Sequence, residues 1–396
     1  MRSGSFIFIA GLILILLIDT ALFFLLKQKL RSKWKTILYW LHSLLFVIIL
    51  VTYHIIISRL KGPEAYFWIE KVIGIIFLFY TPKLLYIIFK SLSWVAGLFS
   101  KLACKILRVI AWYSALLAFL ILLFSITWGR YYYKIETVPV SFDQLPTAFD
   151  GYKIVQLTDL HLGSYGKSYK GIPRLVKEVN ALRPDVIVFT GDMVNNFAAE
   201  MTPWIDQLSQ LKAKDGKFAV TGNHDYGDYT HWKHPEEKRE NLNQFFENMK
   251  AMGFHMLNND NVPLISQGDT LYLTGVENWG KPPFPRYGQL SKALEGTEGH
   301  FVLLLSHDPS HWRAEVLQHS IPLTLSGHTH AMQMGIKIGN YEWSPAKYIY
   351  PEYDGLYRQD HQYLYVSRGQ GYLGFPGRIG LRPVITEIIL TKSVKP

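Results

Sequence analysis

The stretch Leu325-Ser326-Gly327-His328-Thr329-His330 ends an apolar run that begins at Ile321 and is broken by Pro322. If this run is a strand, we expect Gly327 to let the chain turn sharply, so that both imidazoles emerge just past the strand end. Two imidazole nitrogens held at one point are well suited to binding a divalent metal. The stretch therefore predicts a strand that ends in a metal site, provided that other parts of the chain supply matching ligands.

Four other apolar runs are followed in the same way by side chains that can bind metal. They are Lys153–Thr158 before Asp159 and His161, Asp185–Thr190 before Asp192, Lys217–Thr221 before Asn223-His224-Asp225, and Phe301–Ser306 before His307. Helix-like stretches lie between them, at Tyr169–Leu182, Trp204–Leu211 and Lys238–Met252. Continuous apolar runs are typical of strands buried on both faces, and ligands of α/β sheets gather at strand ends. Each cluster alone is weak evidence, but together they predict that five loops converge on one site.

The first third of the chain differs from the rest in its charge. Residues 1–135 carry 16 basic against 3 acidic side chains, a balance of +13, and the whole chain is +10, so residues 136–396 stand at −3. A basic chain suggests a nucleic-acid partner, but here the positive charge lies between apolar runs, so we do not expect one. The single cysteine, Cys104, excludes an intrachain disulfide and a thiolate metal cluster.

Apolar runs in the first 130 residues predict an all-α bundle of membrane-spanning helices. About twenty residues suffice to cross about 30 Å of hydrocarbon. We expect four spans, at about Phe6–Leu26, Thr36–Ile57, Val72–Phe89 and Val109–Trp128. The third run is the weakest because Pro82 and Lys83 fall inside it, and three spans remain an alternative. Lys83 would have to snorkel to the interface or face a neighbouring helix.

The basic residues of the short loops predict the orientation, because they gather on the cytoplasmic side. The first loop holds five basic residues between Lys27 and Lys35, and the second loop offsets its own with Glu64 and Glu70. The third loop holds Lys90, Lys101, Lys105 and Arg108. Loops one and three are therefore expected in the cytoplasm, which places everything after Trp128 outside. The loss of one span would reverse this prediction.

Taken together, the clusters resemble the motifs of the calcineurin-like metallophosphoesterases. The pattern Asp-x-His, Gly-Asp, Gly-Asn-His-Asp, His and Gly-His-x-His is matched in full by residues 159–330, and the resemblance covers roughly residues 150–392. The stretches Gly355-Leu356-Tyr357, Val366–Gly371 and Arg382-Pro383 are similar to the membrane-associated bacterial branch. That branch usually has two glycines after the last histidine, where this chain has Ala331-Met332, so the floor of the pocket is expected to differ.

The resemblance implies a fold, and the apolar runs and basic loops predict a location. The fold class is α/β, a four-layer α-β-β-α sandwich preceded by the transmembrane bundle. We expect a transmembrane region at 1–130, a linker with an edge strand at Glu136–Phe142 in 131–150, and the catalytic domain at 151–396. An integral protein of the bacterial inner membrane, with an extracytoplasmic catalytic domain, is the predicted location.

The resemblance also implies a site that holds two divalent ions. Asp159, His161 and His330 would hold one ion, Asn223, His307 and His328 the other, and Asp192 would bridge them. A bridging hydroxide would attack phosphorus while His224 protonates the leaving oxygen or binds the phosphate. Asp225 would orient His224 through its second nitrogen. Oxygen and imidazole ligands suit Mn, Fe, Zn or Mg, and the sequence does not choose among them.

The predicted function is a membrane-anchored phosphoesterase that hydrolyses a phosphodiester or phosphomonoester, with a substrate at the bilayer such as a lipid-linked phosphate. One alternative is a nucleotide-diacyl-sugar pyrophosphatase of lipid A type synthesis, which requires a cytoplasmic site. Another is a non-catalytic membrane scaffold, against which the complete ligand set argues. A transporter is disfavoured because the spans hold one acidic side chain, Asp19.

Three further features have more than one interpretation: two arginines have two each, and an aromatic loop has three. Arg368 and Arg378 could contact an anionic substrate or form structural pairs, and the aromatic loop Trp279–Pro285 could be a lid, a bilayer contact or a rigid loop.

Overall fold

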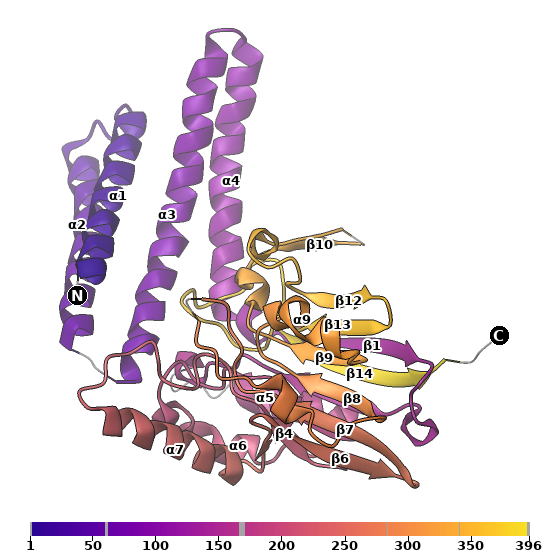
Figure 1. The fold of residues 1–396 in the computed structure, drawn as a ribbon. Helices are drawn as coiled ribbons and strands as arrows, with labels where there is room; N and C mark the ends of the chain where they lie inside the picture. Colours follow the sequence, from indigo (N-terminus) through magenta and orange to yellow (C-terminus); the bar gives the residue numbers. More distant parts are fainter. Residues whose placement is uncertain (1, 60–61, 166–170, 283, 340, 394–396) are drawn as a thin grey trace. The chain divides into compact units, whose positions relative to one another are not determined.

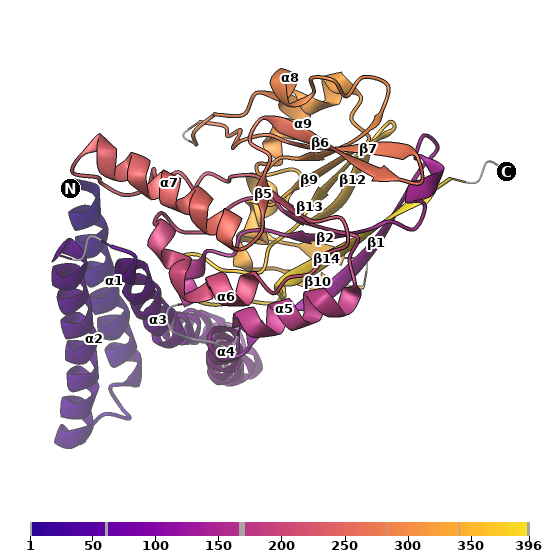
Figure 2. The same ribbon diagram turned by 90° about the horizontal axis from the view of Figure 1, so that it is seen from below.

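A computed structural model describes residues 2–59, 62–165, 171–282, 284–339 and 341–393. The chain divides into two compact units, one of residues 1–129 with 374–377 and one of residues 130–373 with 378–396. The first is helical and the second contains the strands (Figures 1 and 2). Positions 169 and 170 of the predicted helix Tyr169–Leu182 and position 283 of the predicted aromatic loop lie outside the described residues.

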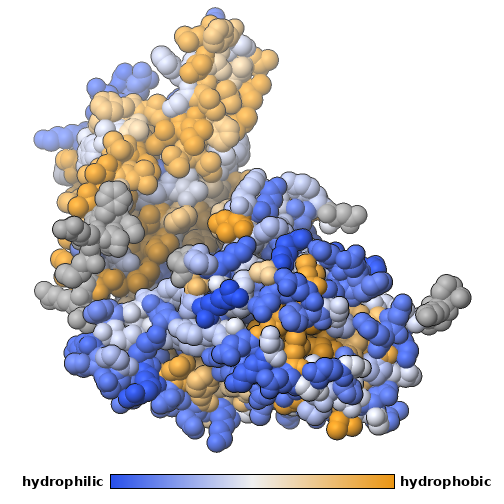
Figure 3. Space-filling model, viewed as in Figure 1, coloured by the Kyte–Doolittle hydropathy of each residue, from blue (hydrophilic) through white to orange (hydrophobic). Residues whose placement is uncertain are grey.

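The helical unit holds four long helices, as predicted. They are α1 (Arg2–Leu26), α2 (Lys33–Arg59), α3 (Glu64–Gly97) and α4 (Lys101–Thr127). All four are long and apolar enough to cross a membrane, and hydrophobic residues cover much of their surface (Figure 3). The third helix, α3, is 34 residues long and is not interrupted by Pro82. Transmembrane helices tolerate proline because neighbouring groups satisfy the freed carbonyl.

Lys83 faces a neighbouring helix instead of snorkelling to the interface. Its Nζ lies 2.6 Å from Oδ1 of Asp19 on α1, whose carboxyl group is fully buried. The hydroxyl of Tyr80 donates to Oδ2 of Asp19 at 2.8 Å, and Nδ1 of His42 on α2 lies 3.4 Å from the lysine nitrogen. The opposite charges of Asp19 and Lys83 therefore neutralise each other, and the ion pair connects α1 with α3.

The second unit is built on two six-stranded sheets. The first sheet has the order β1 (Lys134–Phe142), β14 (Val384–Lys392), β2 (Lys153–Leu157), β3 (Val186–Phe189), β4 (Lys217–Ala219) and β5 (His255–Met256). The second has the order β12 (Gly355–Gln359), β13 (Gln362–Val366), β9 (Leu323–Ser326), β8 (Phe301–Leu305), β7 (Asp269–Gly275) and β6 (Asp260–Ser266). A small hairpin joins β10 (Ile336–Ile338) to β11 (Tyr341–Trp343).

Most neighbouring strands in both sheets are parallel. The strands β2, β3, β4 and β5 run parallel in the first sheet, and β7, β8, β9 and β13 run parallel in the second. The predicted edge strand is present as β1, which pairs in parallel with the late strand β14. Because parallel strands end at the same side of a sheet, the loops that follow β2, β3, β4, β8 and β9 can meet.

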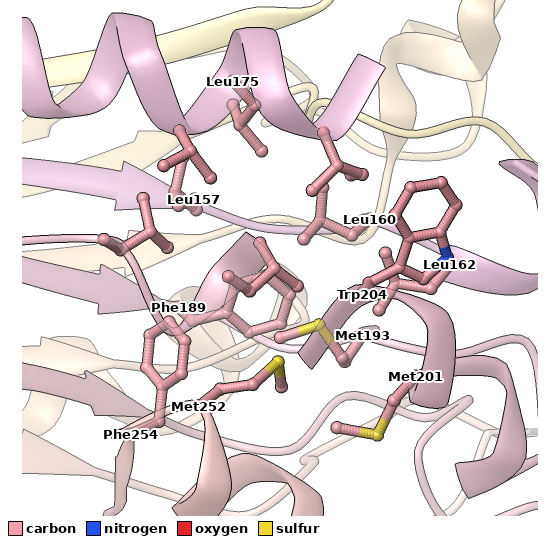
Figure 4. Close-up of a cluster of buried hydrophobic side chains, with 14 of the residues drawn as sticks. Leu157, Leu160, Leu162, Leu175, Phe189, Met193, Met201, Trp204, Met252 and Phe254 are labelled. Carbon is pink, nitrogen blue, oxygen red and sulfur yellow. The ribbon is translucent and has the colours of Figure 1, made fainter. Parts of the chain in front are cut away.

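Helices cover the outer faces of the sheets. The first sheet carries α5 (Gly171–Leu182), α6 (Ile205–Leu208) and α7 (Pro235–Ala251), and the second carries α8 (Leu290–Ala293) and α9 (Ser310–Ala314). Within β3, Ile187 and Phe189 pack toward the helices, whereas Val186 and Val188 pack between the sheets. Figure 4 shows Phe189 in the outer cluster with Leu175 of α5. Burial on both faces explains the continuous apolar runs, and the four-layer sandwich is confirmed.

Candidate metal centre

Every side chain that was predicted to bind metal lies directly after a strand and is held in the interior. Asp159 and His161 follow β2, Asp192 follows β3, Asn223 follows β4, His307 follows β8, and His328 and His330 follow β9. Backbone bonds fasten these loops to one another, since Asp159 N donates to Gly191 O at 2.9 Å and Gly327 N donates to His307 O at 2.9 Å. The convergence of five loops is therefore seen in the structure.

One group of potential ligands combines the two sheets. Nε2 of His161 lies 3.0 Å from Nε2 of His330, which in turn lies 3.3 Å from Oδ1 of Asp159. Burial lowers the pKa of His161 to about 3, so its imidazole is neutral at physiological pH. Ligand atoms that share an ion at about 2.0–2.2 Å lie about 3 Å apart. The spacing and the neutral imidazole both fit a bound cation.

A second group lies beside the first. Nε2 of His307 lies 3.2 Å from Nδ1 of His328 and 3.2 Å from Oδ2 of Asp192. The same Asp192 oxygen lies 3.6 Å from Nε2 of His161, so it stands between the two groups. Asn223 donates its amide to the hydroxyl of Tyr229 at 2.9 Å, and its buried Oδ1 has no hydrogen-bond partner among the described residues. A buried oxygen without a hydrogen-bond partner among the described residues also fits a cation.

The acidic side chains of the site favour a positive charge beside them, which a bound cation would supply in place of a protonated histidine. Burial opposes the charge on His307, but Asp192 and Asp159 outweigh it and raise the pKa of His307 to about 10. Burial likewise opposes ionisation of Asp192, yet the charge of His307 holds the pKa of that carboxyl well below its usual range. Without a metal, His307 therefore carries the positive charge that the acidic groups demand.

The backbone at the site is unusual. Five of the seven predicted ligands have positive φ angles: Asp159 (54°), His161 (48°), Asp192 (60°), His328 (72°) and His330 (50°). This region is unfavourable for residues that carry a Cβ, and such strain is concentrated at functional sites. The sandwich thus holds these side chains in orientations that an unconstrained chain would avoid.

Gly327 has a role other than the predicted one. It is not left-handed, so the expected sharp turn is not what requires glycine. A Cβ at this position would lie 2.2 Å from Oγ1 of Thr158 and 2.4 Å from Oδ2 of Asp159. Glycine is needed because the loops after β2 and β9, which belong to different sheets, approach each other closely.

The predicted pairing of His224 with Asp225 is wrong. Nδ1 of His224 lies 2.8 Å from the carbonyl oxygen of Asn195, so this nitrogen carries the proton and donates it. Asp225 instead accepts backbone N–H groups of Asp192, Met193 and Gly222 at 2.9, 2.8 and 2.8 Å. These hydrogen bonds hold the Asp225 carboxyl group against the backbone amides. They fix the loop that carries Asp192.

The His224 side chain nevertheless lies beside the first group of potential ligands. Its ring centroid is 4.9 Å from that of His161 and 4.5 Å from that of Tyr229. The Asn195 loop that holds it is pinned by the buried Glu200, which accepts the backbone N–H groups of Gly163, Asn195, Asn196 and Phe197. His224 is therefore positioned by a backbone carbonyl and not by an acid.

Two aromatic residues that were not among the predicted ligands complete the site. The hydroxyl of Tyr350 lies 2.8 Å from Nε2 of His328, so it fixes the ring while Nδ1 faces His307. The ring of Phe284 packs edge-on against His328, with centroids 4.9 Å apart. Tyr350 comes from an irregular segment with no motif, whereas Phe284 belongs to the aromatic loop Trp279–Pro285 that the sequence had singled out.

Arg368 and Arg378, for which substrate contact and structural pairing were both considered, form structural contacts. Arg368 pairs with Asp354 at 2.6 Å and with Glu136 at 3.1 Å. Arg378 donates to the carbonyl oxygens of Arg368 and Gly371 at 2.6 and 2.7 Å. In the aromatic loop, Trp279 stacks on His311 with ring centroids 4.7 Å apart, which supports the rigid-loop interpretation.

Comparison with known proteins places the chain in a family. Residues 152–332 match the calcineurin-like phosphoesterase model, and residues 1–130 match a probable calcineurin-like phosphoesterase transmembrane domain. The uncharacterized metallophosphoesterase YkuE of Bacillus subtilis (strain 168) is 30% identical over 255 residues, which are 63% of this chain and 82% of that protein.

Two vertebrate proteins are also similar. The transmembrane protein with metallophosphoesterase domain of Danio rerio is 33% identical over 273 residues, 66% of this chain and 58% of that protein. The protein of the same name from Bos taurus is 34% identical over 270 residues, 65% of this chain and 56% of that protein. The match therefore spans less than three fifths of the length of these two relatives.

Proposed function

Since this chain belongs to the calcineurin-like phosphoesterases and carries a transmembrane domain of four spans, we propose that it hydrolyses a phosphoester with two divalent ions. The observation that carries the two-ion proposal is the position of Asp192. One oxygen of this carboxylate lies 3.6 Å from an imidazole nitrogen of the first group and 3.2 Å from one of the second. A single carboxylate oxygen placed between two ligand sets is the arrangement that a bridging ligand requires.

In this proposal the ligands divide between the two ions. Asp159, His161 and His330 hold one, and Asn223, His307 and His328 hold the other. The donor set contains oxygen and imidazole nitrogen without sulfur, which suits Mn, Fe, Zn or Mg. When bound, such a pair of ions clamps phosphoryl oxygens and makes water acidic enough to attack at neutral pH.

The chain's own side chains supply positioning and a proton. His224 donates Nδ1–H to the carbonyl oxygen of Asn195, and Nε2 is left as the nitrogen that exchanges a proton with the leaving oxygen or binds the phosphate. Tyr350 and Tyr229 hold His328 and Asn223 through their hydroxyl groups. Fixing the rotation of a ligand side chain in this way preserves the geometry of the metal site.

The membrane spans suggest where the substrate is found. A protein with four apolar helices is confined to the bilayer, so we infer a phosphoester at or near the membrane, such as a lipid-linked phosphate. The basic first and third loops support an extracytoplasmic catalytic domain.

Metal counting and turnover test the proposal on one sample. The full chain in detergent is loaded with Mn²⁺, its metal is counted by mass spectrometry, and hydrolysis of bis-p-nitrophenyl phosphate is followed. We expect two ions for each chain and turnover. Asp192→Ala should lose both, whereas His224→Ala should keep its metal and lose about 10²–10⁴-fold in kcat.

A matched histidine control is His300→Ala, because His300 is exposed and packs on Tyr272 away from the ligands. It should keep both metal and turnover. Unchanged metal content in Asp192→Ala would show that the bridging assignment is wrong. No turnover with any divalent metal would favour the scaffold alternative.

A further inference from the structure

A groove lies at the end of the hairpin formed by α3 and α4. It measures about 410 Å³ and is lined by Trp94, Gly97 and Leu98 from the end of α3 and by Lys101, Cys104, Lys105 and Arg108 from α4. This volume is within the range of about 300–1,000 Å³ that is common for small-molecule sites. A Cβ on Gly97 would lie 3.3 Å from Sγ of Cys104, so two small residues bring the helices together at this point.

Three cations share one face of α4. Lys101, Lys105 and Arg108 are spaced four and three residues apart, which places them on the same side of a helix over a length of about 10 Å. All three side chains are exposed. None forms an ion pair within the described parts of the chain, and the sequence contains no acidic residue from position 71 to 135. The positive charge of the groove is therefore not balanced by the hairpin itself.

Apolar side chains surround the charged groove. Trp94 is 72% exposed and Leu98 is 69% exposed. The cationic face of α4 continues with Val109 and Leu116, which are also exposed and apolar. A cationic groove that leads onto an apolar helix face matches the shape of a phospholipid, with a charged headgroup above hydrocarbon. Tryptophan at the edge of such a groove is typical of the membrane–water interface.

We propose that this groove binds the phosphate headgroup of an anionic phospholipid, whose acyl chains lie along the exposed face of α4. Basic pockets between transmembrane helices are known to recognise such headgroups. An acidic soluble protein would use the cations but not the apolar face that follows them. The proposal is independent of the catalytic site, because none of its residues belongs to the second unit.

Lipid titration tests the site. The full chain in neutral detergent is titrated with phosphatidylglycerol or phosphatidylcholine, and bound lipid is counted by native mass spectrometry. We expect saturable binding of phosphatidylglycerol and not of phosphatidylcholine. The variant Lys101→Gln/Lys105→Gln/Arg108→Gln should bind phosphatidylglycerol about 100-fold more weakly, since each basic residue near the surface contributes about fivefold.

Two further variants separate a specific groove from diffuse charge. Lys27→Gln/Lys33→Gln/Lys35→Gln removes the same charge from exposed positions between the end of α1 and the first turn of α2 and should leave binding within about threefold. Lys101→Arg/Lys105→Arg keeps the charge and should retain binding. Equal losses in both triple variants would overturn the proposal. Displacement of the lipid by an equal concentration of inorganic phosphate would also overturn it, because the site would then recognise a soluble anion.

Discussion

At the scale of single residues, the turn after the last histidine has a backbone that suits glycine better than the Ala331-Met332 of this chain. His330, Ala331, Met332 and Gln333 all have positive φ angles, between 47° and 56°. Each left-handed residue that carries a Cβ costs about 1–2 kcal/mol. The two glycines of the bacterial branch would occupy positions 331 and 332 without that cost. In this chain, Ala331 and Met332 adopt a left-handed backbone that is strained for residues with a Cβ.

The two positions predict different outcomes for glycine. Met332→Gly should raise the free energy of unfolding by up to about 1 kcal/mol, because relief of strain exceeds the added flexibility of the unfolded chain. Ala331→Gly should be close to neutral, since the methyl group of Ala331 is fully buried against Ala346, Tyr353 and Leu381. Thermal unfolding of the full chain with each substitution measures the difference. A destabilised Met332→Gly variant would contradict the argument.

Local sequence predicted which side chains gather at the site but not how they are held. Asp159, His161 and His330 follow strand-like runs, and strand ends are marked by composition. The partner of His224 is a carbonyl of Asn195, 29 residues away along the chain, and the partner of His328 is Tyr350, 22 residues away. A single hydrogen bond from an irregular loop leaves no periodic signal, so these partners could not be predicted.

At the scale of elements, the edge strand β1 is fastened to the second sheet by an ion pair between the half-buried Glu136 and the buried Arg368. Arg368 follows β13 and pairs with Glu136 of β1 as well as with Asp354. Burial opposes the charge on Glu136, but Arg368 and Lys134 outweigh it and lower the pKa of this carboxyl to about 2. The first strand thus depends on an interaction that acid removes.

The pH dependence follows from the sign of this shift. The pKa of Glu136 is lower in the folded state, so its contribution is complete above the ordinary value of 4.5 and is lost as the pH falls toward 2. Glu136→Gln should lower the free energy of unfolding by about 1–3 kcal/mol at pH 7. Between pH 4.5 and pH 2, the free energy of unfolding of the variant should fall less steeply than that of the unchanged chain. Denaturant unfolding monitored by near-UV circular dichroism measures both effects.

Glu178→Gln is the matched control, because Glu178 pairs with Arg174 one helical turn away on the outside of α5. Such surface pairs contribute about 0.3–0.5 kcal/mol. An equal acid sensitivity in the Glu136 and Glu178 variants would show that the pair of Glu136 with Arg368 has no special role.

Because Asp19 and Lys83 form an ion pair inside the helical bundle, substitutions at the two positions should have non-additive effects on the free energy of unfolding. Asp19→Ala leaves the ammonium of Lys83 buried without its partner, which should cost about 3–5 kcal/mol. Asp19→Ala/Lys83→Met removes both charges and should cost clearly less than the single change. Thermal unfolding in detergent gives the coupling energy. A double variant at least as unstable as Asp19→Ala would show that the two charges do not interact.

Helices and strands were largely predictable because their signals are periodic or continuous. The weakest predicted span became the longest helix, since Pro82 removes one backbone bond and the surrounding apolar residues still favour a helix. The short helices α6 and α8 each have four residues. At that length tertiary contacts, rather than local propensity, decide whether a helix forms.

At the scale of the whole molecule, the sidedness of the membrane unit decides which substrates can reach the catalytic site. An alkaline phosphatase fused after Pro396 should be active, because this reporter needs an exported environment and four spans with cytoplasmic first and third loops, as we propose, would put that end outside. A fusion within the basic first loop, after Leu30, should be inactive. The reverse pattern would place the site in the cytoplasm and promote the nucleotide-diacyl-sugar alternative.

The site also has a consequence for how the chain matures. Each group of potential ligands draws on both sheets, and His161 and His330, which meet at 3.0 Å, are 169 residues apart in the sequence. Contacts over such distances form late, after the cost of closing long loops has been met. A chain with only one sheet assembled holds only part of each ligand group. Under the proposed function, hydrolytic competence should therefore appear in one step at the end of folding, when both sheets are in place.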